Sequence, residues 1–429
     1  MSSPSLVRVG VLGCGNVGGP LVHLIGEHGS AIAESTGIQL EVVGVAVRSP
    51  SKERPYPVPP GLLTHDAEAV VADPAVDVVV EMIGGIEPAR TLILQALKAG
   101  KPVVTANKEL LANVGSELFE AASAAGVDLL FEASVGGGIP LIRPLRESLA
   151  GERIRRVMGI VNGTTNFLLT RMTEDGTSYA EALTEAQGLG YAERDPTADV
   201  EGFDAGAKAA IIATIAFGAS VVAGDVYREG ISGVTPDDIA FAGRLGYTVK
   251  LLAVAERVGE EVAVRVHPTM LPSTHPLASV RESFNAVFIE GEAVGELMLY
   301  GRGAGGMPTA SAVLGDLVDA AHNLRSGGAG RTMTTRRAAI RPIDEMTSQY
   351  YLNMQVADRP GVLAAVADVF GRHEVSIRSM EQEGLGSEAR LVFITHKARE
   401  RDMQSCLHDL RELDAVERIS SFLRVLGEE

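Results

Sequence analysis

The run Gly13–Gly18, with the sequence GCGNVG, constrains the fold more than any other feature of the chain. It follows the apolar run Val7–Leu12 and precedes a helical pattern. In this spacing the first glycine permits a tight turn, the second lets a pyrophosphate approach the backbone, and the third lets the helix pack closely on the strand. The pattern predicts a dinucleotide site, and the alternative is a glycine-rich turn in another kind of α/β protein. The residues expected at that site are Gly13, Gly15, Asn16, Val17 and Gly18.

Short apolar runs alternate with helical patterns through residues 7–130, which indicates strands that are buried on both faces. This alternation predicts an α/β fold with a Rossmann-type, doubly wound parallel sheet. Residues 1–134 are therefore expected to form a nucleotide-binding domain. Its strands are expected over 7–12, 41–47, 76–83, 102–106 and 127–131, and its clearest helices over 88–99 and 110–125.

The pattern changes near residue 135, and two further domains are expected. Residues 135–308 are predicted to form an α+β domain, and the glycine-rich stretch 325–346 a linker. Residues 347–429 show the order βαββαβ, which predicts a four-stranded antiparallel sheet with two helices on one face. Within 135–308, helical patterns crowd 140–223, an apolar helix is expected over 209–224, and strands are expected over 248–257, 262–271 and 286–290.

Charge and cysteine usage limit the partners and the compartment. The chain carries a net charge of −17, and an acidic surface disfavours nucleic acid and anionic lipid as partners. Cys14 and Cys406 are far apart and lack metal-ligand spacing, which favours a reducing compartment. The N-terminus shows no signal-peptide pattern, and no apolar run reaches the length of a membrane span. A cytoplasmic protein without a nucleic-acid or membrane partner is expected.

The residues after the second predicted strand bear on the choice of cofactor. An NAD site usually has a carboxylate there, which binds the ribose hydroxyls. Here Arg48 follows the strand, with Ser49 and Lys52 beyond it. A cation at this place favours the 2′-phosphate of NADP(H), with NAD(H) also possible. The alternative is a solvated loop arginine.

Two lysines are candidates for the chemistry. Lys108 ends the run Thr105–Lys108 after a predicted strand, and ligands bind at the carboxyl ends of strands in such sheets. Lys208 follows Asp204 by four residues, so that both share a helix face. An ammonium group can stabilise and protonate the alkoxide that forms when hydride reaches an aldehyde. The alternatives are a surface lysine at 108 and a structural ion pair between Asp204 and Lys208.

An acidic segment precedes Lys208 and is a candidate substrate site. Its carboxylates could hold the amino group of a substrate, although a solvated acidic loop or a cation site is also possible. Together with a nicotinamide site and two lysines, they predict the reduction of an amino-acid aldehyde. The acidic residues are Glu193, Asp195, Asp199, Glu201 and Asp204.

Several blocks of the chain, in order, resemble the homoserine dehydrogenase family in its monofunctional form with a C-terminal ACT domain. The resemblance implies a reversible, NAD(P)H-dependent reduction of L-aspartate 4-semialdehyde to L-homoserine, in threonine, methionine and isoleucine biosynthesis. It also implies a homodimer or homotetramer, in which residues 135–308 bind substrate and dimerise, and a helix over about 309–324 that completes the nucleotide-binding domain. The blocks are Thr105–Lys108, Gly159–Asn166, Gly188–Lys208, Gly301–Gly306 and Pro308–Ala310.

The resemblance also implies roles for individual residues. Lys208 would be the acid/base, and Lys108 would assist it while touching cofactor and substrate. Residues lining the cofactor would include Asn16, Val17, Arg48, Thr105, Lys108, Gly190 and Gly303. The substrate would be bound by Glu193, Asp199 and Asp204. A sodium ion would lie on the backbone carbonyls of Glu132, Val135, Gly137 and Ile139.

The C-terminal part resembles an ACT domain through the run Asp358–Leu363. Pro360 and Gly361 shape a turn that exposes backbone N–H groups, which can bind an amino-acid carboxylate. Threonine is the effector that the resemblance implies, and a purely structural dimerisation module is the alternative. Two other functions stay open: another ACT-bearing nicotinamide oxidoreductase with a different amino-acid precursor, and a regulatory protein that binds cofactor and amino acid without catalysis.

Overall fold

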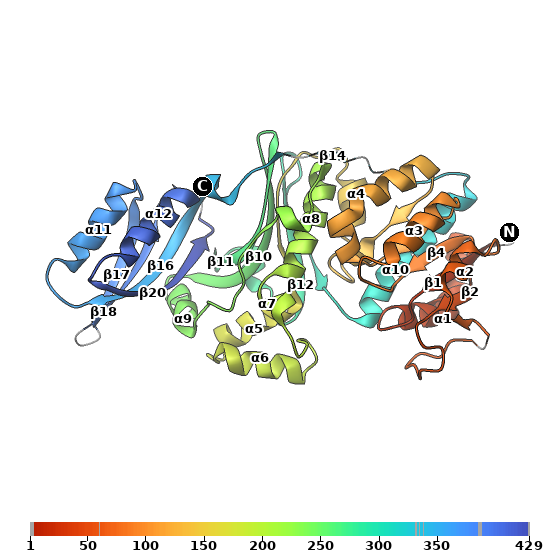
Figure 1. Cartoon of the computed structure of the whole chain (residues 1–429), viewed down its shortest axis with the longest axis horizontal. Helices are drawn as coiled ribbons and strands as arrows, with labels where there is room; N and C mark the ends of the chain where they lie inside the picture. Colours follow the sequence, from red (N-terminus) through yellow and green to blue (C-terminus); the bar gives the residue numbers. More distant parts are fainter. Residues whose placement is uncertain are drawn as a thin grey trace. The chain divides into compact units, whose positions relative to one another are not determined.

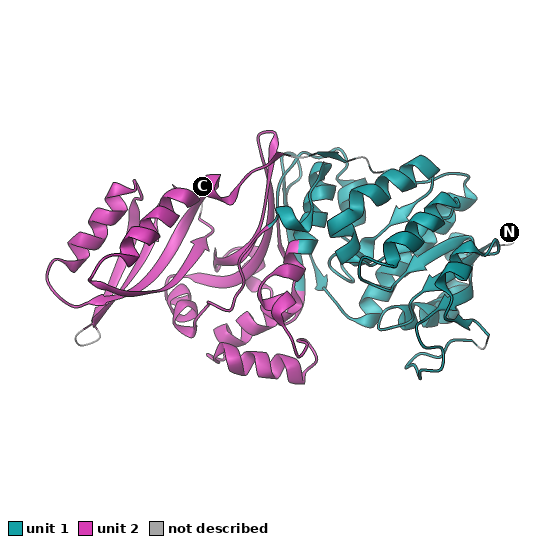
Figure 2. Ribbon diagram, viewed as in Figure 1, with its two compact units in different colours: residues 1–157, 207–226, 285–338 teal, residues 158–206, 227–284, 339–429 magenta. Residues whose placement is uncertain are grey.

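The structure is a computed structural model that describes residues 4–59, 61–330, 333, 335–337, 339–384 and 388–427. The described residues fall into two compact units, and the chain passes between them repeatedly (Figure 2). Unit 1 comprises residues 1–157, 207–226 and 285–338, and unit 2 comprises residues 158–206, 227–284 and 339–429. No helix among the described residues is both long and apolar enough to cross a membrane.

Unit 1 contains a parallel sheet with the order β3-β2-β1-β4-β5-β6 among the described residues (Figure 1). This sheet confirms the predicted Rossmann-type fold. The last strands are shorter than expected, and β3 was not expected because two residues carry no readable periodicity. The strands are β1 (Ser5–Leu12), β2 (Ile38–Ala46), β3 (Leu63–Thr64), β4 (Val78–Glu81), β5 (Val103–Thr105) and β6 (Leu129–Leu130).

A helix from late in the sequence completes the core of this sheet. Ala310, Val313 and Leu317 of the late helix α10 pack with Val9 and Leu21, all of them buried. Because α10 belongs to the nucleotide-binding core, its N-terminal end is held close to the dinucleotide turn described below. The helices around the sheet are α1 (Gly18–Thr36), α2 (Ala67–Ala72), α3 (Ala89–Lys98), α4 (Lys108–Ala125) and α10 (Gly306–Arg325).

The region expected to be helical, 140–223, also contains a strand. The strand β7 (Ile154–Ile160) was missed because the arginines around Ile154 hide its alternation. The expected helix 209–224 is α8 (Phe203–Phe217), which starts earlier and ends where Gly218 takes a left-handed conformation (φ 62°). The remaining elements between residues 132 and 226 are η1 (Glu132–Ser134), η2 (Pro144–Ser148), β8 (Ala219–Ser220) and η3 (Ala223–Asp225). Beyond them, unit 1 adds the neighbouring strands β12 (Phe284–Gly291) and β13 (Gly295–Arg302), and β14 (Arg336–Arg337), which pairs with β8.

Unit 2 contains four helices and two long strands before the C-terminal part. Strands β10 and β11 pair antiparallel. The described residues of this part also form the helices α5, α6, α7 and α9. The helices are α5 (Gly163–Glu174), α6 (Tyr179–Gly188), α7 (Thr197–Val200) and α9 (Pro236–Arg244). The strands and short turns are β9 (Tyr227–Arg228), β10 (Tyr247–Val258), β11 (Glu261–Pro272), η4 (Pro276–Ser279), β15 (Ala339–Ile340) and η5 (Ile343–Glu345).

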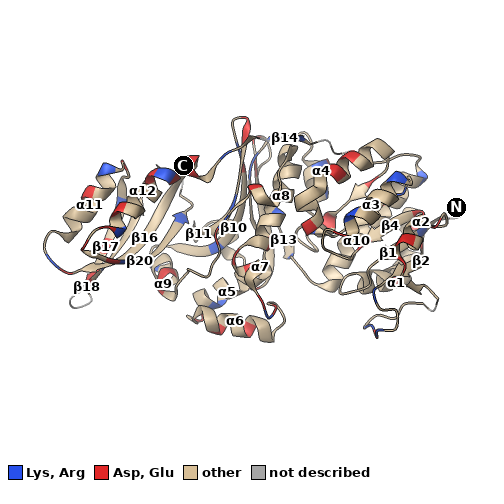
Figure 3. Ribbon diagram, in the orientation of Figure 1, with Lys and Arg blue, Asp and Glu red and all other residues tan. Residues whose placement is uncertain are grey.

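The C-terminal part has the predicted βαββαβ order, as the resemblance to an ACT domain implies. Its described strands form an antiparallel sheet in the order β17-β18-β16-β20. Val366 and Phe370 of α11 and Met403 and Leu407 of α12 share one core, while acidic and basic residues are interspersed along both helices (Figure 3). The elements are β16 (Thr347–Ala357), α11 (Val362–Arg372), β17 (Ile377–Gly384), β18 (Glu388–Thr395), β19 (Ala398–Arg399), α12 (Glu400–Arg411) and β20 (Val416–Val425).

Strand pairing joins the ACT domain to the substrate part of unit 2. β20 lies parallel to β11, with Thr269 beside Arg424 and Met270 beside Val425. The stretch 325–346, expected to be a linker, also contributes paired strands, because β14 pairs with β8 and β15 with β11. The ACT sheet therefore continues the sheet of β10 and β11.

A buried carboxylate strengthens this junction. Asp238, in the first turn of α9, is fully buried and accepts hydrogen bonds from the backbone and hydroxyl of Thr235 at 3.0 and 2.7 Å. It also accepts from Tyr351 Oη at 3.2 Å, from Asn353 Nδ2 at 3.3 Å and from the Ser421 hydroxyl. Since side chains alternate along β16, Tyr351 and Asn353 point away from the face that carries the core residue Leu352.

We predict that Asp238→Ala lowers the free energy of unfolding by about 2–4 kcal/mol, because several buried donors lose their acceptor at once. The matched control is Asp237→Ala, since Asp237 is the exposed neighbour and pairs with Arg390 at the surface. Urea unfolding of both variants measures the difference. Equal stability of the two variants would contradict this account of the junction.

Candidate active site

The three glycines of the dinucleotide turn have three different surroundings. Gly13 has a φ of 99°, and a Cβ there would lie 2.6 Å from the carbonyl oxygen of Met82. A Cβ on Gly18 would lie 2.1 Å from the oxygen of Gly13, whereas no described atom lies within 4 Å of a Cβ on Gly15. The turn is therefore tight at Gly13, closely packed at Gly18, and open to a ligand at Gly15, as a pyrophosphate site requires.

The turn lies where the strand order of the parallel sheet reverses. β1 has β2 on one side and β4 on the other, and the turn follows β1. In open α/β sheets ligands bind in the crevice at this point. Val17, the N-cap residue of α1, makes no side-chain capping bond in the described structure. Within the first turn the Gly19 N–H donates to the Gly15 carbonyl at 3.1 Å and Pro20 has no N–H, so the Gly18 N–H is the group that this turn can offer to an anion.

Two distant glycine segments approach this turn within unit 1. A Cβ on Gly306 would lie 2.3 Å from the oxygen of Asn16, and Gly305 has a φ of 119°. A Cβ on Gly137 would lie 2.5 Å from the oxygen of Gly303. The predicted residues Gly137 and Gly303 therefore approach each other through their backbones. Gly303 lies three residues before Gly306, which approaches the dinucleotide turn at Asn16.

The loop after β2 carries a cation that sequence reasoning missed. Arg48 is exposed, which fits both a residue that meets a 2′-phosphate and a solvated loop arginine. Arg54 folds back on the same loop and donates to the carbonyl oxygens of Ser49 at 2.8 Å and Lys52 at 2.6 Å. It also lies beside Cys14, whose thiol pKa is raised by burial, an effect that the Arg54 charge opposes. No sequence motif marks Arg54, because its partners are backbone atoms.

Lys108 and Thr105 lie at the carboxyl end of β5. Lys108 is the exposed first residue of α4, and Asn107 caps this helix by accepting from the Leu110 N–H at 3.1 Å. Thr105 is fully buried. Its hydroxyl donates to Glu81 at 2.6 Å. Because the side chain is engaged in this internal hydrogen bond, a ligand would contact the Thr105 backbone.

A polar cluster in unit 2 gathers two of the predicted substrate residues. The Asn162 side-chain amide donates to Asp199 Oδ1 at 2.7 Å and to Asp204 Oδ2 at 2.9 Å. The Thr164 hydroxyl contacts Asp199 Oδ2 at 3.1 Å and the carbonyl oxygen of Tyr191 at 2.6 Å. Asn162, Thr164 and Asp204 are all buried. Paired carboxylates of this kind can hold an ammonium group of a ligand.

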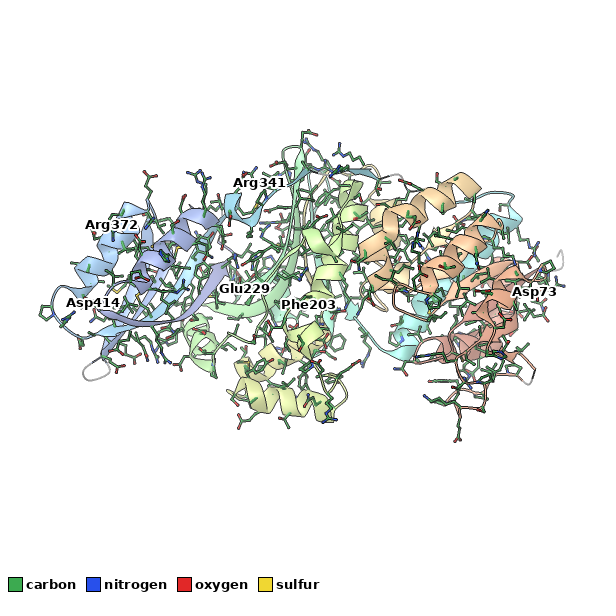
Figure 4. All side chains as sticks on the ribbon, viewed as in Figure 1. Asp73, Phe203, Glu229, Arg341, Arg372 and Asp414 are labelled. Carbon is green, nitrogen blue, oxygen red and sulfur yellow. The ribbon has the colours of Figure 1, made fainter. Side chains whose placement is uncertain are left out.

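Lys208 follows this cluster by one helical turn. Asp204 and Lys208 lie on α8, and each is less than one-tenth exposed. The start of α8 packs on Arg228, whose guanidinium lies 4.8 Å from the ring of the exposed Phe203 (Figure 4). A Cβ on Gly206 would lie 2.8 Å from Arg228, so α8 requires a glycine at this contact.

The other predicted residues of the acidic segment lie outside this cluster. Glu193 is exposed, and its carbonyl oxygen accepts from the Gln187 side chain at 3.1 Å. Gly190 takes a left-handed conformation (φ 77°) just after α6. Asn162 and Thr164 belong to the block Gly159–Asn166, but the sequence assigned them no role because their partners are more than 25 residues away.

The residues of the expected sodium loop lie in unit 1, in a segment whose two ends are joined by hydrogen bonds of the Glu132 side chain. The Glu132 carboxylate accepts from the N–H groups of Leu141, Ile142 and Arg143 at 2.5–2.7 Å, so only its backbone carbonyl is left for an ion. Its own N–H donates to Asp316, and burial raises the pKa of Asp316 to about 7. Val135 and Ile139 are buried. Among the described residues, no group of three His, Cys, Asp or Glu side chains could hold a metal ion.

The parallel sheet, the glycine turn and the lysine at a strand end define an NAD(P)-dependent oxidoreductase with an appended ACT domain. Comparison with known families agrees with this class. Family profiles match residues 13–132 as the homoserine dehydrogenase NAD-binding domain, 140–318 as homoserine dehydrogenase, and 350–414 as an ACT domain. The chain belongs to the homoserine dehydrogenase family, which confirms the resemblance seen in the sequence.

Relatives match over nearly the full length. The homoserine dehydrogenase of Corynebacterium glutamicum is 51% identical, over 98% of this chain and 96% of its own length, and that of Bacillus subtilis is 43% identical over 98% of each. A crystal structure of a homoserine dehydrogenase from Thiobacillus denitrificans superposes with a TM-score of 0.92, at 39% identity and with 99% of both chains covered. A hyperthermophilic archaeal homoserine dehydrogenase in complex with NADPH has a TM-score of 0.62 and 30% identity, and covers 73% of this chain and 97% of its own.

We predict that Gly15→Ala weakens NADPH binding at least about tenfold while the protein stays folded, because the added methyl occupies space open to the ligand and meets no described atom. Gly26→Ala is the control, since Gly26 lies on the same helix and also has open space around it. Fluorescence titration with NADPH measures both. Unchanged affinity in Gly15→Ala would show that the pyrophosphate lies elsewhere.

Proposed function

We propose that this chain reduces L-aspartate 4-semialdehyde reversibly to L-homoserine, on the branch of cytoplasmic amino-acid biosynthesis that leads to threonine, methionine and isoleucine. The observation that carries the proposal is the Asn162–Asp199–Asp204 cluster one helical turn before Lys208. The two carboxylates of this cluster would bind the ammonium group of the substrate, and Lys208 would interact with its aldehyde oxygen.

The lysines act on the oxygen of the aldehyde. The bound dinucleotide supplies hydride to the carbonyl carbon. Lys208 donates its proton to the oxygen as negative charge develops there, and takes a proton from the homoserine hydroxyl in the reverse direction. Lys108, at the start of α4, assists by stabilising the same charge and by contacting cofactor and substrate.

The carboxylates recognise the amino-acid end of the substrate. Asp199 and Asp204 would accept from the ammonium group in addition to their hydrogen bonds within the cluster, because each ionised carboxylate oxygen has two lone pairs. Glu193, an exposed residue of the same segment, would also bind the substrate, and Gly190 would line the cofactor. A substrate without an α-ammonium group would lose this interaction with the two carboxylates, which disfavours its binding.

NADPH is the preferred cofactor in this proposal, with NADH also used. Arg48 meets the 2′-phosphate, and Arg54 holds the loop that presents it. The archaeal relative was solved in complex with NADPH, which supports the same choice here.

A sodium ion on the backbone carbonyls of Glu132, Val135, Gly137 and Ile139 is part of the proposal. Two features support it. Gly136 and Gly137 take left-handed conformations that allow the carbonyls of this loop to converge, and the Glu132 carboxylate closes the loop into a ring.

The ACT domain would bind threonine at the Asp358–Gly361 turn and inhibit the enzyme, which would work as a homodimer or homotetramer. Gly361 (φ 92°) starts α11, and the exposed Asp358 can accept from the ammonium group. The signal would pass through the junction with β11. There the buried Arg424 binds Glu229 (labelled in Figure 4) at 2.5 Å and Glu400 at 2.6 Å. Cutting the chain after about residue 340 would remove Arg424 and Glu400 and deprive Glu229 of its ion pair, so regulation must be tested in the intact protein.

Lys208→Ala is expected to lower kcat by about 10²–10⁴, the range for loss of an acid/base group, while NADPH still binds. Lys397→Ala, at an exposed lysine of the ACT domain, is the control. The assay follows NADPH oxidation with L-aspartate 4-semialdehyde. Near-normal turnover by Lys208→Ala would refute its role, and an inactive wild-type enzyme would refute the proposed reaction.

Arg48→Ala is expected to weaken NADPH binding by about 1.5–3 kcal/mol, because a charge-assisted bond to the 2′-phosphate is lost. NADH, which has no 2′-phosphate, should bind almost as before. Arg401→Ala, an exposed arginine of the ACT domain, serves as the control. Equal losses for both cofactors would restore the interpretation of Arg48 as a solvated arginine.

Threonine is expected to inhibit the full-length enzyme, and Asp358→Ala should require at least about tenfold more of it, since one charged contact is lost. Asp368→Ala, on the exposed face of α11, is the matched control. If the intact enzyme is insensitive and calorimetry detects no threonine binding, the ACT domain has a structural role only.

A further inference from the structure

Glu81 is a buried carboxylate that none of the roles above uses. It is the last residue of β4 and is fully buried. It lies beside Leu12 of β1 and Thr105 of β5 in the sheet register. Glu81 therefore lies at the carboxyl edge of the sheet, between the strand that leads to the dinucleotide turn and the strand that leads to Lys108.

The carboxylate has three donors, which explains why the sheet edge can hold it. The N–H groups of Ile83 and Gly84 donate to Oε1 at 2.6 and 3.1 Å, and the Thr105 hydroxyl donates to Oε2 at 2.6 Å. Hydrogen bonds to an ionised acceptor are about twice as strong as neutral ones. One side chain thus fixes the turn after β4 and the end of β5 together.

These bonds extend to Lys108. The Thr105 hydroxyl oxygen accepts from the Asn107 N–H at 3.0 Å, and the Asn107 side chain donates to the Gly85 carbonyl at 2.7 Å. Asn107 is also the N-cap of α4, whose first residue is Lys108. The backbone position of Lys108 is therefore set by Glu81 through Thr105 and Asn107.

The same turn touches the dinucleotide site. The Met82 N–H donates to the Leu12 carbonyl at 2.7 Å, and the Met82 carbonyl occupies the space that a side chain on Gly13 would need. Gly84 and Gly85 follow in left-handed conformations. Glu81 thus links the turn that packs against Gly13 to the helix that begins with Lys108.

We propose that Glu81 is a positioning residue that sets Lys108 relative to the bound cofactor. It touches neither substrate nor cofactor and acts through Thr105 and Asn107. This inference rests on the proposed role of Lys108. Because misplacement by about 1 Å can cost about 100-fold in rate, the removal of the charge should lower kcat more than it lowers binding.

The test is a double-mutant cycle between Glu81→Gln and Lys108→Ala. In the wild-type background Glu81→Gln should lower kcat about 10- to 100-fold and change the NADPH dissociation constant less than about threefold. In the Lys108→Ala background it should lower kcat less than about twofold further, since residues that act through one another are not additive. Glu68→Gln, at an exposed glutamate of α2, is the control and should behave as wild type.

Other outcomes overturn the inference. Equal losses in both backgrounds would mean that Glu81 does not act through Lys108, and lost NADPH affinity with intact kcat would make it part of the cofactor site. If Glu81→Gln does not fold, Thr105→Val replaces it in the cycle, and Thr105→Ser should lose several-fold less because it keeps the hydroxyl donor. A wild-type enzyme without turnover would instead mean that the proposed reaction is wrong.

Discussion

Two neighbouring carboxylates, the half-buried Asp199 and the buried Asp204, share one donor, which is the Asn162 amide. Without this donor the two like charges would repel each other more strongly, because Asp204 has little contact with water. The constraint determines much of unit 2. Asn162 must cap α5 with its oxygen, accepting from the Thr165 N–H at 2.9 Å, while its nitrogen reaches both carboxylates. These hydrogen bonds fix the start of α8 relative to the start of α5, and Lys208 follows one turn later on α8.

Unit 1 depends on a different constraint, which is the close approach of backbones. Gly13 meets Met82, Gly306 meets Asn16, and Gly137 meets Gly303, each at a distance that excludes a Cβ. These contacts bring together segments that are far apart in sequence, and they need no side chain. Part of the high glycine content of this chain therefore serves the close approach of backbones where the cofactor and the expected ion would bind.

The sequence predicted features whose determinants are local. The glycine spacing identified the dinucleotide turn, the alternation of strands and helices predicted the parallel sheet, and the order of elements after residue 347 predicted the ACT fold. Features whose determinants are tertiary were not predicted. Arg54 binds backbone carbonyls, Asn162 and Asp238 bind partners far along the chain, and β20 pairs with β11. No periodicity marks any of these contacts. β7 was missed for a local reason, because its arginines hide the alternation.

The most direct test of this account is a crystal structure of the enzyme with NADP⁺ and L-homoserine bound. The account predicts that Lys208 Nζ lies within hydrogen-bond distance of the homoserine hydroxyl, and that Asp199 and Asp204 accept from its ammonium group. A homoserine hydroxyl that faces another side chain, with Lys208 turned away from it, would contradict the central claim.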